Sequence, residues 1–88
     1  MSKRAALEEK LEHLNPEALF ADGFDDALVG IGQQFNSYVV VYDRAKCIQI
    51  LMDRDGMDRE GADEFFDFNV VGAYLGEFTP VFLDIEED

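Results

Sequence analysis

The sequence contains one histidine, one cysteine and no tryptophan. A hydrolase triad needs a base, and the only candidate, His13, falls at the end of an amphipathic segment, where a cationic side chain suits the helix dipole. Cys47 cannot form a disulfide within the chain, which is typical of a cytoplasmic protein. No apolar run approaches the about 18 residues of a membrane span, and the N-terminus lacks a signal-peptide pattern. We therefore expect no membrane association.

Basic residues are also scarce. Seven Lys and Arg stand against 20 Asp and Glu, for a net charge of −13. No Lys or Arg lies between Glu12 and Asp43, or between Glu60 and Asp88. Such a field opposes binding to nucleic acid and favours a basic partner. The alternative interpretation is that the excess acid serves solubility alone.

The spacing of apolar residues predicts a single α+β domain over residues 1–88. In chain order, the predicted elements are helices at 3–14 and 16–21, strands at 27–34 and 38–43, helices at 44–53 and after Asp58, and a strand at 79–83. This order, ααββααβ, predicts a three-stranded, mainly antiparallel sheet with helices on one face. The acidic tail at 84–88 is expected to fray.

Polar residues mark the ends of the predicted helices. Asn15-Pro16 can end the first helix and begin the second, while Asp43 and Asp58 are placed to cap the two later helices. Pro80 places the last strand at a sheet edge or at a strand start. The inner faces of the two later helices are predicted to carry Ala45, Ile48, Leu51 and Met52, and then Ala62, Phe65, Phe66 and Asn69.

Two motifs resemble ligand sites but lack a necessary residue. Gly30 and Gly32 lie inside a predicted strand with no lysine after them, so they do not form a phosphate-binding loop. Two glycines on one face would instead let a helix or another backbone approach closely. A calcium loop with Gly61 as its sixth residue would begin at Gly56, which has no side chain to bind the ion. We therefore expect no cofactor, no metal and no catalytic residue, and hence no enzyme.

An aromatic segment near the C-terminus, FFDFNVVGAYLGEFTP, leaves two interpretations open. Its aromatic residues can belong to the core, with the glycines in turns. Alternatively, Phe68, Tyr74 and Phe78 can form a partner-binding or self-association surface, because Tyr and Phe are enriched in such surfaces.

Three segments resemble small proteins common in bacteriophage genomes: ADGFDDALVG, VYDRAKCIQILM and FNVVGAYLGEFTP. The resemblance covers roughly residues 15–83, and the last segment is the most specific. The acidic tail lies outside it, and Gly61 stands where a helix-favouring Glu is more usual. The family has no assigned reaction, so the resemblance implies a phage origin and carries over no catalytic residue.

A phage origin favours a non-catalytic inhibitor of a host nucleic-acid-handling or defence protein, such as an anti-CRISPR protein that mimics DNA. It would act in the host cytoplasm, as a monomer or a homodimer, on a host protein with a basic surface. The predicted partner-binding residues are Glu17, Asp22, Asp25, Asp26, Glu60, Asp63, Glu64, Asp67 and Glu77. Two alternatives remain: a structural or regulatory accessory protein that acts through the aromatic and glycine segment, and a small-ligand binder that uses Asp43 and Asn69.

Overall fold

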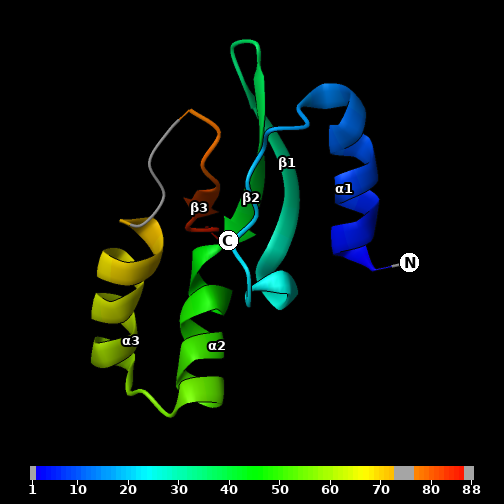
Figure 1. The fold of residues 1–88 in the computed structure, drawn as a ribbon. Coiled ribbons are helices and arrows are strands. Elements are labelled where there is room, and N and C mark those ends of the chain that lie inside the picture. Colours follow the sequence, from blue (N-terminus) through cyan, green and yellow to red (C-terminus); the bar gives the residue numbers. More distant parts are fainter. Residues whose placement is uncertain (1, 73–76, 87–88) are drawn as a thin grey trace.

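A computed structural model describes residues 2–72 and 77–86 (Figure 1). Within these ranges the elements are α1 (Lys3–Leu14), β1 (Leu28–Gln34), β2 (Ser37–Asp43), α2 (Arg44–Asp55), α3 (Arg59–Phe65) and β3 (Val81–Leu83). A 3₁₀ turn, Asp25–Ala27, precedes β1, and a π-helical segment, Phe66–Val71, continues α3. The predicted α+β class is confirmed.

The three strands form one sheet in the order β1-β2-β3. The β1 and β2 strands pair antiparallel, and β3 pairs with β2 in parallel, so the sheet is mixed. In Figure 1, α2 continues downward from the end of β2 and α3 returns beside it. This helical crossover brings the chain back beside the last three residues of β2, where β3 pairs with it, and a parallel neighbour requires such a crossover.

The caps and the edge strand follow the sequence prediction. The Asp43 carboxylate accepts a hydrogen bond from the backbone N–H of Lys46, and Asp58 accepts one from Gly61. These bonds satisfy N–H groups that an α-helix leaves free at its first turn. The short β3 lies at the sheet edge directly after Pro80, where a missing N–H donor is tolerated.

The predicted second helix at 16–21 is wrong. The polar groups of residues 15–21 form hydrogen bonds with the sheet and within a local turn. The Asn15 side-chain amide donates to the carbonyl of Tyr38 at 2.7 Å, and its oxygen accepts from the backbone N–H of Glu17. Farther on, the backbone N–H of Ala21 donates to the hydroxyl of Tyr42 at 2.7 Å. The segment therefore connects α1 to the 3₁₀ turn without forming a helix of its own.

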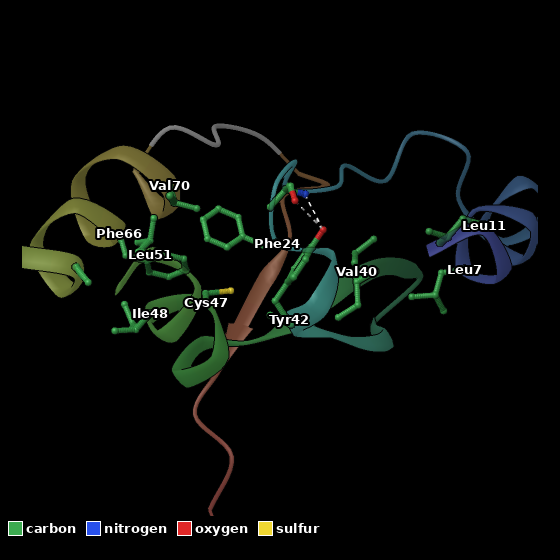
Figure 2. Close-up of a cluster of buried hydrophobic side chains, with 14 residues drawn as sticks. Leu7, Leu11, Phe24, Val40, Tyr42, Cys47, Ile48, Leu51, Phe66 and Val70 are labelled. Atoms are coloured by element: carbon green, nitrogen blue, oxygen red, sulfur yellow. Dashed lines mark hydrogen bonds between the residues drawn. The ribbon is translucent and has the colours of Figure 1, made fainter. Parts of the chain in front are cut away.

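The core lies on the face of β2 that carries Val40 and Tyr42 (Figure 2). From α1, Leu7 and Leu11 pack into this cluster, and Leu51 of α2 is fully buried in it. The cluster also contains Ala21, Phe24, Ala27, Leu28, Cys47, Ile48, Ala62, Phe66 and Val70. Aromatic rings join the layers: Phe66 meets Phe24 and Phe82 edge-on, and Phe82 stacks on Tyr42.

Two details of the predicted inner faces are wrong. In α2, Ala45 is exposed and Cys47 is buried in its place. At the end of α3 and in the π-helical segment that follows, Phe65 and Asn69 are exposed, while Val70 is buried. The buried residues Ala62, Phe66 and Val70 recur every fourth position, which suits a turn wider than that of an α-helix.

The other face of the sheet carries Gly30 and Gly32, which pair with Val41 and Val39 of β2. Paired residues of neighbouring strands project to the same side. A Cβ atom added to Gly30 would meet nothing within 4 Å, and one added to Gly32 would meet a methyl group of Val41 at 3.0 Å. Within the described ranges, the close helix approach predicted for these glycines is not made.

Candidate acidic interaction surface

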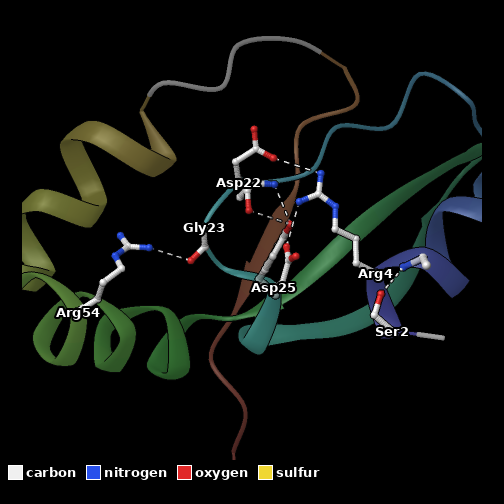
Figure 3. A network of polar contacts seen from close by, with 9 residues as sticks. Ser2, Arg4, Asp22, Gly23, Asp25 and Arg54 are labelled. Atoms are coloured by element: carbon white, nitrogen blue, oxygen red, sulfur yellow. Dashed lines mark hydrogen bonds and ion pairs between the residues drawn. The ribbon is translucent and has the colours of Figure 1, made fainter.

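Arg4, in the first turn of α1, binds two of the predicted partner-binding acids (Figure 3). Its guanidinium lies 3.1 Å from the carboxylate of Asp22 and 3.0 Å from that of Asp25. The same group lies over the ring of Phe20, 4.8 Å from the ring centre. A cation over an aromatic face is attracted by the negative potential of the ring. Arg4 therefore connects α1 to the segment before β1.

Arg44 makes a second arrangement of the same kind at the start of α2. Its guanidinium contacts Asp63 at 3.3 Å and Asp67 at 2.7 Å, and it lies 5.5 Å from the centre of the Phe66 ring. The hydrogen bond with Asp67 is the largest cause that raises the pKa of Arg44 above its ordinary value. Two of the four predicted acids of the α3 segment are thus used inside the molecule.

Arg54, near the end of α2, makes the third arrangement. Its guanidinium donates to the carbonyl of Gly23 at 3.0 Å, pairs with Asp55 at 3.1 Å and lies 5.5 Å from the centre of the Phe24 ring. Figure 3 shows that it reaches Gly23 from the side opposite to Arg4. The hydrogen bond from Arg54 lowers the pKa of Asp55.

The stretches without bases are therefore not free of positive charge in space. Four of the nine predicted acids, Asp22, Asp25, Asp63 and Asp67, are paired with arginines from other segments. The remaining five are exposed and form no ion pair within the described part of the chain: Glu17, Asp26, Glu60, Glu64 and Glu77. Their assignment to a partner stays a prediction.

Glu60 and Glu64 are the best-placed pair among these acids. They lie one turn apart on α3, so their carboxylates share one helix face. Phe68 follows one turn later and its side chain is 80% exposed. Exposed carboxylates beside an exposed phenyl ring form what we call the α3 surface: Glu60, Glu64 and Phe68.

Of the other two predicted aromatic residues, only Phe78 lies in the described part of the chain. Phe78 is half-buried, and its carbonyl accepts a hydrogen bond from the backbone N–H of Leu19 at 3.1 Å. Tyr74 lies outside the described residues. The sequence reasoning missed Phe35, which is 89% exposed at the tip of the hairpin. A signal was available, because Phe is not among the residues that tight turns favour.

A shallow pocket of about 510 Å³ lies between the 3₁₀ turn and the end of α2. Its lining residues are Gly23, Asp25, Asp26, Ile50, Asp53 and Arg54. Across residues 2–72 and 77–86, no three His, Cys, Asp or Glu side chains are arranged to hold a metal ion. Asp43 and Asn69 were proposed for a ligand pocket. The Asp43 carboxylate instead caps α2, and Asn69 is exposed.

The single thiol lies on the buried face of α2. Cys47 has no exposed surface, and burial is the main cause that raises its pKa to about 12. A thiol with such a pKa remains protonated near neutral pH, and the thiolate is the reactive form. Cys47 therefore acts as a small apolar core residue.

Fold and surface together define the class of this protein as a small acidic α+β domain. No protein-family model, curated protein or solved structure matches the chain. Among the described residues, no helix combines the length and the apolar character needed to cross a membrane.

Proposed function

We propose that this protein is a non-catalytic, phage-derived inhibitor of a host nucleic-acid-handling or defence protein, of the anti-CRISPR kind. The observation that carries the proposal is the α3 surface, where Glu60 and Glu64 are exposed and have no ion-pair partner in the described ranges. The net charge of −13 supports a basic partner over a nucleic acid or an anionic membrane.

The mechanism is competition for a basic cleft. Carboxylates on one helix face take the place of phosphates and engage Lys and Arg side chains that otherwise bind DNA or RNA. Phe68 adds apolar contact beside these charges. Because the attraction acts between exposed charges, binding weakens as the salt concentration rises.

The experiment is a displacement assay with purified host proteins that have basic nucleic-acid clefts, including a CRISPR effector complex. The protein is titrated against labelled nucleic acid at several salt concentrations, and fluorescence anisotropy reports displacement. The double variant E60Q/E64Q should displace about fivefold less well, since exposed ion pairs contribute about 0.2–1 kcal/mol each.

The chain offers a matched control in E8Q/E12Q. Glu8 and Glu12 are also exposed and also lie one turn apart, but on α1. In Figure 1, α1 and α3 lie on opposite sides of the molecule. Both variants change the net charge equally, so a purely general charge effect would weaken them alike. Equal losses, or displacement that ignores salt, would contradict the proposal.

A second candidate function is a structural or regulatory phage accessory protein that associates through apolar surface, as a homodimer. The large exposure of Phe68 favours this candidate. It requires a stable oligomer in sedimentation velocity, and F68A should shift that oligomer towards monomer. The F78A variant should have a similar effect if Phe78 contributes to the same surface.

A further inference from the structure

The tip of the β1–β2 hairpin presents a phenylalanine in an unfavourable backbone conformation. Phe35 has φ = 54°, in the left-handed region that bulky L-residues rarely adopt. Its side chain is 89% exposed, so little packing within the chain offsets this conformation. Figure 1 shows the hairpin extending beyond the rest of the sheet. An outlier of this kind suggests a function for the side chain.

Three arginines of the same chain show what a phenylalanine ring can bind. Arg4, Arg44 and Arg54 each lie over a phenylalanine ring, at 4.8–5.5 Å from its centre, and each also contacts a carboxylate. The ring attracts the guanidinium face, while the carboxylate accepts its N–H groups. This chain thus builds the same three-part arrangement at three separate places.

The hairpin tip also has a carboxylate near the Phe35 ring, which is the second group that binds arginine in those arrangements. It lines a pocket of about 390 Å³ together with Glu77, which comes from the segment before β3. Gln34, Asn36, Ser37 and Val39 complete the lining. The Glu77 carboxylate is exposed, and within residues 2–72 and 77–86 it forms no ion pair. The ring and the carboxylate are therefore both open to an arginine from outside the chain.

We propose that Phe35 and Glu77 form an acceptor site for an arginine side chain of a basic partner protein. The arginine lies over the Phe35 ring, its N–H groups reach Glu77, and its aliphatic part packs against Val39. This inference rests on the proposed function for the existence of a basic partner, and it adds a second contact remote in sequence from the α3 surface. A lysine fits less well, because its compact ammonium lacks the planar face that stacks on a ring.

The test uses short peptides as probes. The full chain, labelled with ¹⁵N and with ¹³C on phenylalanine, is titrated by NMR with acetyl-Gly-Arg-Gly-amide and separately with the lysine counterpart. The arginine peptide should shift the Phe35 ring and Glu77 amide signals, with an apparent Kd at least threefold below that of the lysine peptide. F35N and E77Q should each weaken binding at least threefold, and F35Y, which keeps a ring face, should retain it.

F68L is the matched control, because it removes the other highly exposed phenyl ring and leaves the hairpin intact. Equal affinity for the two peptides, or unchanged binding by F35N, would overturn the arginine site. Loss of binding in F68L with retention in F35N would overturn the site at Phe35 and place the acceptor on the α3 surface. The proposed function would survive either result if E60Q/E64Q still displaces nucleic acid less well than E8Q/E12Q.

Discussion

Replacing Tyr42 with phenylalanine removes one oxygen atom from the centre of the core. Tyr42 is fully buried, and its hydroxyl accepts a hydrogen bond from the backbone N–H of Ala21 at 2.7 Å. The same hydroxyl donates to the carbonyl of Ala21 at 3.3 Å (Figure 2). These two bonds anchor the connection between α1 and the 3₁₀ turn to the sheet.

The expected loss in the free energy of unfolding depends on which polar groups lose their partner when the hydroxyl is removed. Ala21 is also fully buried, so its N–H loses its acceptor without gaining water. Its carbonyl keeps a bond from the N–H of Phe24 at 3.4 Å. A buried donor left without a partner costs about 1–3 kcal/mol. We expect Y42F to lower the free energy of unfolding by about 2 kcal/mol, and hence the Tm by roughly 8–16 °C for a domain of this size.

The assay is urea denaturation followed by circular dichroism, together with a thermal melt. The control is Y38F, because Tyr38 is half-buried and its hydroxyl forms no hydrogen bond within the described ranges. Y38F should change the free energy of unfolding by less than about 0.5 kcal/mol. If Y42F falls within the same limit, the hydroxyl does not anchor the segment and the reasoning fails.

Three further predictions concern single positions. F35N should raise the free energy of unfolding by about 0.5–1 kcal/mol in urea denaturation, because asparagine tolerates a positive φ and the lost phenyl ring is almost fully exposed. A loss of stability would instead show that the Phe35 ring packs against other residues of the chain. G30A should be tolerated, since its methyl group meets open space, whereas G56A should lower the urea midpoint because Gly56 ends α2 at φ = 70°; equal midpoints would contradict this contrast. The thiol reagent DTNB should label Cys47 only when the protein unfolds. Because the buried thiol has its pKa raised to about 12, only the unfolded thiol ionises between about pH 9 and 12, so its contribution to stability is complete below about pH 9 and is lost over that range. The C47A variant should flatten this pH dependence of the urea midpoint.

Local signals were sufficient for most of the secondary structure. The apolar spacing of Leu7 and Leu11 and the capping carboxylates of Asp43 and Asp58 act within one or two turns, and the structure has the corresponding helices. The segment at 16–21 departs from the prediction because its donors and acceptors bond to β2, more than 20 residues away. A tertiary hydrogen bond outweighed a local helix signal there.

The candidate surface was less accessible to sequence reasoning. The exposure of Phe68 agrees with one of the two interpretations of the aromatic segment, but the list of nine acids did not separate free carboxylates from paired ones. A phenylalanine is unusual in a tight turn, and this signal marked Phe35, but the exposure of its side chain does not follow from its sequence neighbours. Only the packed chain shows that the hairpin tip stands clear of the core.

The sequence by itself determined the acidity, the α+β class and the positions of most helices and strands, because composition, periodicity and capping are properties of neighbouring residues. The tertiary structure decided which carboxylates are paired with arginines and which remain unpaired on the surface. Arg4 and Arg44 reach carboxylates 18 to 23 residues away, so stretches that lack bases along the chain are partly neutralised in space. Electrostatic interaction depends on the distance between charges and not on their order in the sequence.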